Sequence, residues 1–175
     1  MSKLIIETER LFLRELSAGE DAEFILELVN EPAWIRNIGD RGIREVEGAR
    51  DYILNGPAVS YEKFGFGLYL VGLKATGESI GICGLIKRDS LEDVDIGFAF
   101  LENFWSKGYA AESAFAVMDH ARRALALKRV VAITIPSNRG SINVLEKIGF
   151  KFEKMIKTDA DEEEIMLFAS EVKKN

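Results

Sequence analysis

The chain has 175 residues, of which 47% are hydrophobic and 30% charged, and its formal net charge is −6 at pH 7. This length suits one domain that buries about two-thirds of its unfolded surface, so we expect residues 1–175 to form a single domain. The negative charge argues against a nucleic-acid partner. The sequence also lacks the run of about 18 apolar residues that would predict a membrane-spanning helix.

Cysteine and histidine are scarce. The single cysteine, Cys83, excludes an internal disulfide, and the single histidine, His120, argues against a histidine-based metal site or a Ser/His/Asp relay. Charges within the first seven residues interrupt any signal-peptide apolar core. We therefore expect a cytoplasmic protein without a resident metal.

The first part of the chain predicts one strand and two helices. Alternation over residues 8–14 places Leu11 and Leu13 on one face of a first or edge strand. A helix is expected after Ser17, ended by Pro32, and residues 34–43 are expected to form a loop. A second helix is expected over about residues 44–54.

From Gly67 onward the pattern changes to strands and helices in alternation. Strands are expected over 68–73, 79–86, about 94–100, 129–135, 150–156 and 164–168, and helices over 110–126 and 141–148. This order predicts a mixed α/β sheet with helices on both faces. Residues 94–135 should form a right-handed parallel crossover.

The turn over residues 105–112, Trp-Ser-Lys-Gly-Tyr-Ala-Ala-Glu, lies between an expected strand and an alanine-rich helix. A small-residue turn that opens a helix presents free backbone N–H groups at the positive end of the helix dipole, an arrangement that binds phosphate. Lys107 adds a cation beside the turn. Gly108 alone would indicate only a chain reversal, but the residues downstream favour the binding interpretation.

Three stretches together resemble the GNAT acetyltransferase superfamily, most closely its RimJ/RimL-type branch. They are residues 8–14 (Thr-Glu-Arg-Leu-Phe-Leu-Arg), residues 105–112, and residues 138–150 (Asn-Arg-Gly-Ser-Ile-Asn-Val-Leu-Glu-Lys-Ile-Gly-Phe). The resemblance implies a GNAT-like fold with a mixed, mostly antiparallel sheet of about six or seven strands. It also implies a splay between the strands at 94–101 and 129–135, and an enzyme that moves the acetyl group of acetyl-CoA directly to a primary amine.

The resemblance further implies that the turn holds the coenzyme A pyrophosphate and that the neighbouring strand and helix hold the pantetheine arm. The expected coenzyme-binding residues are Phe98, Ala99, Phe100, Leu101, Trp105, Ser106, Lys107, Gly108, Tyr109, Ala110, Asn138, Ser141 and Asn143. Ser106 stands where the branch often has glycine, and a positive φ there would carry a cost. Asn138 also fits a helix N-cap, and Lys107 also fits a solvated side chain.

Two residues are candidates for the chemistry that the resemblance implies. Ser141 matches a position near the thiol, where its hydroxyl would protonate the departing thiolate, and Asp95 is the candidate base for the amine. An ordinary first-turn serine and a solvated strand aspartate remain the alternatives. We interpret Glu112 as structural because a carboxylate in a first helical turn complements the dipole.

The acceptor side of the site is the least defined by the sequence. In this fold the first helices, their loop and the final hairpin line it, and the residues expected there are Trp34, Arg36, Tyr61, Phe66 and Asp159. The branch favours the N-terminal α-amine of a protein or peptide. A polyamine, amino acid or aminoglycoside is an alternative acceptor, and a catalytically silent acyl-CoA-binding module is an alternative function. Monomer and homodimer are both compatible with the sequence.

Overall fold

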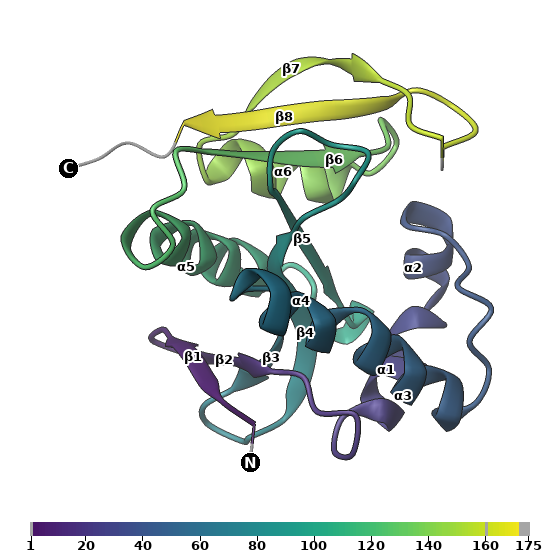
Figure 1. The fold of residues 1–175 in the computed structure, drawn as a ribbon. Coiled ribbons are helices and arrows are strands. Elements are labelled where there is room, and N and C mark those ends of the chain that lie inside the picture. Colours follow the sequence, from purple (N-terminus) through teal and green to yellow (C-terminus); the bar gives the residue numbers. More distant parts are fainter. Residues whose placement is uncertain (1, 160, 172–175) are drawn as a thin grey trace.

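A computed structural model describes residues 2–159 and 161–171. Its centre is an eight-stranded sheet of order β1-β2-β3-β4-β5-β6-β8-β7 (Figure 1). The strands are β1 (Leu4–Glu7), β2 (Leu11–Glu15), β3 (Leu68–Leu73), β4 (Ser79–Ile86), β5 (Asp95–Phe100), β6 (Arg129–Thr134), β7 (Lys151–Ile156) and β8 (Ile165–Glu171). Every neighbouring pair is antiparallel except β5 and β6, which are parallel.

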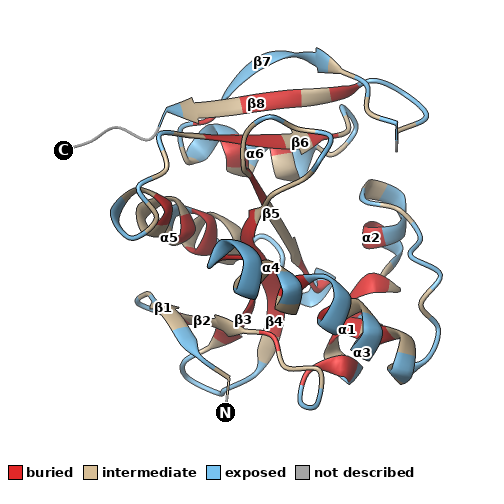
Figure 2. Cartoon of the chain, viewed as in Figure 1, coloured by how far each residue is buried: buried red, intermediate tan, exposed pale blue. Residues whose placement is uncertain are grey.

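The helices divide between the two faces of the sheet. They are α1 (Ala22–Val29), α2 (Pro32–Asn37), α3 (Val46–Asn55), α4 (Pro57–Phe64), α5 (Tyr109–Arg123) and α6 (Arg139–Lys147), with a short 3-10 helix η1 (Glu102–Phe104). α5 and α6 contribute Val117 and Leu145 to one core, beside Leu11 of β2. α1 and α3 contribute to a second core, which includes Leu70 and Ile82 from the opposite face of the sheet. Figure 2 shows these buried residues as red segments on the strands and on one side of α5.

The sheet opens between β5 and β6. β5 pairs with β4 along its full length, and β6 pairs likewise with β8. Between β5 and β6, however, one residue pair is in register, Asp95 with Val131. The two halves of the sheet therefore diverge beyond Asp95, with β6, β7 and β8 on one side of β5 and β1 to β4 on the other (Figure 1). The expected parallel connection and the expected splay are both confirmed.

The expectations for the first part of the chain were partly wrong. Residues 4–15 form two strands of a hairpin, because Thr8 N–H bonds to the Leu11 carbonyl and reverses the chain. This extra strand raises the strand count above the expected six or seven. Pro32 and Pro57 each begin a helix, α2 and α4, although Pro32 was expected to end a helix and residues 34–43 to form a loop. Proline suits the first helical position because its missing N–H would have no partner there.

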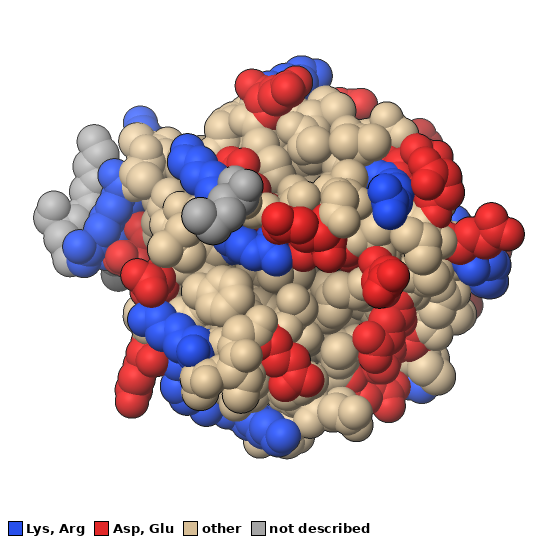
Figure 3. All heavy atoms as spheres, turned by 90° about the horizontal axis from the view of Figure 1, so that it is seen from below, with Lys and Arg blue, Asp and Glu red and all other residues tan. Residues whose placement is uncertain are grey.

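The surface carries charges of both signs. On the face in Figure 3, acidic and basic side chains alternate with uncharged ones. Within residues 2–159 and 161–171, no helix is both long and apolar enough to cross a membrane.

Candidate active site

A cleft of about 580 Å³ lies where the sheet opens. Its walls come from β5, from the turn that begins α5, from the start of α6, and from α2. The residues that line it are Leu28, Glu31, Ala33, Trp34, Arg36, Asn37, Ile38, Phe98, Ala99, Phe100, Phe104, Trp105, Ser106, Gly108, Tyr109, Ala110, Ala111, Ser137, Asn138, Arg139, Gly140, Ser141, Asn143, Val144 and Lys147. The structure thus brings together segments that are far apart in the sequence.

The turn before α5 exposes its backbone donors to this cleft. Ser106 and Gly108 have φ values of 58° and 83°, so a serine occupies the conformation that glycine adopts most readily. Gly108 is the N-cap of α5 and supplies no side-chain cap. Among the described residues, none accepts a hydrogen bond from the backbone N–H groups of residues 106–111. Unpaired N–H groups at a helix start form an anion-binding site.

Two predicted coenzyme residues near this turn do not line the cleft. The Lys107 ammonium lies 5.4 Å from the centroid of the Phe104 ring. Leu101 is buried in the second core with 8% exposure. Trp105 does line the cleft, and its indole N–H donates to the Phe100 carbonyl at 2.8 Å. That bond ties the turn to the end of β5.

The start of α6 forms the facing wall. The Asn138 side-chain oxygen accepts a hydrogen bond from Ser141 N–H at 3.2 Å, so Asn138 is the N-cap of α6. Asn138, Ser141 and Asn143 also line the cleft. Two cations that the sequence analysis did not single out also line the cleft, Arg139 at the first position of α6 and Lys147 at its last. Arg139 fits an anionic ligand held between the two helix starts.

Asp95 lies outside the cleft lining, and its expected role as a base for the amine stays a prediction. Its side chain is 1% exposed, and Oδ1 accepts a hydrogen bond from Arg88 Nε at 2.9 Å. Burial raises the pKa of the Asp95 carboxyl above its ordinary value, although Arg88 pulls the pKa down. Asp95 sits where β5 and β6 make their register contact. Its position is that of a structural ion pair at the base of the splay.

Three of the predicted acceptor residues also lie away from the cleft. The Tyr61 hydroxyl donates to the Leu68 carbonyl and accepts from Leu16 N–H, and burial raises its pKa. Phe66 is buried in the first core. Asp159 lies on the connection between β7 and β8 and is exposed. A half-buried, doubly hydrogen-bonded tyrosine and a core phenylalanine stabilise the fold, and neither lines the cavity.

One end of the cleft is formed by α2 and the residues before it. Of the residues predicted to contact the acceptor, Trp34 and Arg36 line this end. Glu31, which the sequence analysis missed, is the one carboxylate among the described residues that line the cleft. Its Oε2 accepts a hydrogen bond from Glu102 N–H at 2.9 Å, and this long-range contact leaves no local sequence signal. The Trp34 indole N–H is buried and has no partner among the described residues.

The remaining reactive side chains are not arranged for catalysis. Cys83 is fully buried, and burial raises the pKa of its thiol to about 12, which leaves it protonated and inert. Its place in the core is the one expected from its apolar strand. Among the described residues, no group of three or more His, Cys, Asp and Glu side chains could hold a metal ion.

Comparisons with known proteins agree with this geometry. The sequence profile of the acetyltransferase (GNAT) domain matches residues 10–151. The uncharacterized N-acetyltransferase p20 of Bacillus licheniformis is 29% identical over 153 residues, covering 86% of this chain and 84% of p20. An acetyltransferase from Agrobacterium tumefaciens has a similar structure, with a TM-score of 0.79 and 26% identity over 94% of this chain and 92% of that one.

RimL, a ribosomal L7/L12 alpha-N-protein acetyltransferase solved with coenzyme A, shares the fold with a TM-score of 0.81. It is 19% identical, and the match covers 97% of this chain and 98% of RimL. The chain belongs to the GNAT acetyltransferase family and is an acyltransferase. It shares its fold with RimL.

Proposed function

We propose that the chain is a single N-acetyltransferase domain that transfers acetyl from acetyl-CoA to the α-amine at the N-terminus of a protein or peptide. The observation that carries the coenzyme part is the turn over residues 106–111, whose backbone N–H groups are unpaired among the described residues and border the cleft. A pyrophosphate carries the charge and the acceptor oxygens that such a turn binds. Arg139 at the start of α6 adds positive charge for the same ligand.

The residues present fit the rest of the coenzyme. Phe98, Ala99 and Phe100 border the gap that β6 leaves, and this mostly apolar strip suits a pantetheine arm. When bound there, acetyl-CoA supplies the acetyl thioester. Ser141 lines the opposite wall on the first turn of α6, and its hydroxyl holds the proton for the sulfur that departs.

The acceptor end favours a cationic amine that carries a hydrogen-bond acceptor nearby. The Glu31 carboxylate attracts the ammonium form of the amine, and Arg36 favours a carbonyl or carboxylate close to it. The unpaired Trp34 indole N–H has the same preference. A peptide N-terminus combines these groups, whereas a polyamine has no carbonyl. The name of RimL, an alpha-N-protein acetyltransferase with the same fold, supports this choice.

Calorimetric titration with acetyl-CoA tests the coenzyme part. The wild-type protein should bind with micromolar affinity, and Gly108→Asp should abolish binding because a side chain at a φ of 83° strains the turn and its Cβ would lie 3.3 Å from Arg10 Nη2. Gly77→Asp is the matched control, since Gly77 has a similar φ of 77° in an open hairpin turn. No binding by the wild-type protein at millimolar acetyl-CoA would overturn the proposal.

A panel of amines tests the acceptor part. Thiol release from acetyl-CoA would be followed with short peptides that have free α-amines, with matched α-acetylated peptides that contain lysine, and with spermidine, free amino acids and an aminoglycoside. We expect release with the free α-amine peptides and a large drop for Glu31→Gln. Thiol release with the small amines alone would show that a small amine, and not a peptide, is the acceptor. If no amine in the panel gave thiol release, the chain would be a silent acyl-CoA-binding module.

A further inference from the structure

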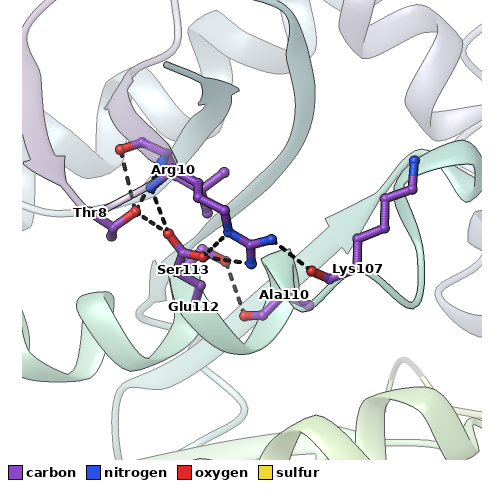
Figure 4. Close-up of polar contacts among 7 residues, drawn as sticks. Thr8, Arg10, Lys107, Ala110, Glu112 and Ser113 are labelled. Carbon is purple, nitrogen blue, oxygen red and sulfur yellow. Dashed lines mark hydrogen bonds and ion pairs between the residues drawn. The ribbon is translucent and has the colours of Figure 1, made fainter. Parts of the chain in front are cut away.

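The turn between β1 and β2 is bonded to the turn that begins α5, as Figure 4 shows. Glu112, in the first turn of α5, accepts three hydrogen bonds from the turn between β1 and β2. They come from the Thr8 hydroxyl at 2.6 Å, from Arg10 N–H at 3.0 Å, and from Arg10 Nε at 2.7 Å. Thr8 and Glu112 are 104 residues apart, so these bonds join two distant segments.

Arg10 also bonds to the turn itself. Its Nη1 donates to the Lys107 carbonyl at 3.0 Å, and its guanidinium lies 4.5 Å from the centroid of the Tyr109 ring. Arg10 does not line the cleft. It therefore contacts the turn from the side away from the proposed coenzyme.

The Arg10 bond fixes the direction of a donor on the other side. In a planar trans peptide the C=O and the following N–H point in opposite directions. The chain has no cis peptide bond among the described residues. Because Arg10 holds the Lys107 carbonyl on its own side, the Gly108 N–H of the same peptide unit points the opposite way, and Gly108 lines the cleft.

The turn before α5 needs this support because few contacts within the turn fix its conformation. Ser106 and Gly108 both have positive φ values, and this backbone conformation is unfavourable for serine. The turn's N–H groups make no bonds to described residues that would hold it in place. A donor array binds an anion best when it is already oriented before the ligand arrives.

We propose that Arg10, held by Glu112 and Thr8, is a positioning residue that keeps the Lys107–Gly108 peptide oriented for coenzyme binding. This inference rests on the proposed function and assigns a binding role to the hairpin turn and to Glu112. The Arg10 side chain is 43% exposed and that of Glu112 is 21% exposed, so the pair contributes little to folding by itself. Its effect should therefore appear mainly in coenzyme affinity.

The test compares coenzyme affinity with thermal stability across four variants. Calorimetric titration with acetyl-CoA should give a dissociation constant about tenfold higher for Arg10→Ala, the loss of one charge-assisted hydrogen bond. Arg10→Lys keeps the charge but cannot form the fork that bonds Glu112 and Lys107 together, so it should not restore affinity. Glu112→Gln should weaken binding less, and the double variant Arg10→Ala/Glu112→Gln should bind no worse than Arg10→Ala.

Arg14→Ala is the matched control. Arg14 lies on β2, which begins one residue after Arg10, and forms a bidentate ion pair with Asp21, at 2.8 and 2.7 Å, away from the cleft lining. We expect this control to lower the melting temperature while leaving the acetyl-CoA dissociation constant unchanged. Equal affinity of the wild type and Arg10→Ala would overturn the inference and leave the proposed function standing. An equal loss of affinity in Arg14→Ala would mean that Arg10 acts only through the overall stability of the fold and would overturn the inference. No binding by the wild type would overturn both proposals.

Discussion

Replacing Arg88 with alanine tests whether the Arg88–Asp95 ion pair is structural. The Asp95 carboxylate is 1% exposed and is bonded to Arg88 Nε at 2.9 Å. Removing one partner of a buried charged pair costs about 1–3 kcal/mol or more, because the remaining charge stays desolvated. Arg88 is 36% exposed, so solvent already weakens the pair. We therefore expect Arg88→Ala to lower the free energy of unfolding by about 2 kcal/mol at neutral pH.

The pH dependence of this cost has a definite sign. The pKa of Asp95 is raised in the folded state, so the folded protein binds the carboxyl proton more tightly than the unfolded chain does. The stability that this proton confers is fully present below the unfolded pKa of 3.8 and is lost as pH rises through the higher folded pKa. Without Arg88 the folded pKa rises further, so the cost of Arg88→Ala should shrink as pH falls.

Urea unfolding at about pH 7.5 and about pH 5 measures both effects. The double variant Arg88→Ala/Asp95→Asn should recover most of the lost stability, because the amide carries no charge to desolvate. Asp95→Asn alone should retain its acetyl-transfer rate within about twofold and keep the wild-type pH–rate profile. A general base would instead lose about 10²–10⁴-fold in rate together with the acidic limb of the profile. That loss, or a cost of Arg88→Ala that is identical at both pH values, would refute the reasoning.

Three further predictions concern α6. Ser141→Ala should lower the turnover number by about tenfold or more while the acetyl-CoA dissociation constant stays unchanged, as thiol-release kinetics and calorimetry would show. Asn138→Ala should cost about 1 kcal/mol in urea unfolding because the N-cap bond to Ser141 N–H is lost. Leu145→Ala should cost about 2–5 kcal/mol, since Leu145 is 1% exposed in the first core. Phe115→Ala, at a 65% exposed position on α5, is the control and should stay within about 0.5 kcal/mol of the wild type.

The central features of the fold could be predicted because they are local in the sequence. Alternation defined the meander of β3, β4 and β5, and the alanine-rich segment defined α5. The Asn138 cap followed from the residue type at one position, while a positive φ at Ser106 was raised only by the family resemblance, in which glycine often stands there. These signals act through backbone preferences, which neighbouring residues largely determine.

Other features depend on contacts between distant segments. Asp95 was placed on the correct strand, but its role is set by Arg88 and by the point at which β5 leaves β6. Tyr61 is an aromatic residue of the kind expected in a ligand site, yet its hydroxyl forms hydrogen bonds with two backbone groups inside the fold. Pairing partners of this kind are decided by tertiary packing and carry no periodic signal.

The same distinction explains why most of the expected coenzyme residues, but only two of the five expected acceptor residues, line the cleft. A turn that opens a helix binds an anion through backbone N–H groups, so a short motif predicts the chemistry wherever it occurs. The acceptor side uses side chains, and Glu31 reaches the cleft through a bond to Glu102, 71 residues away. Trp34 anchors α2 in the second core, while Arg36 and Ile38 beside it are exposed. We expect substitutions at these exposed positions to leave both cores undisturbed, whatever amine the protein accepts, so the acceptor must be identified by assay and not from the fold.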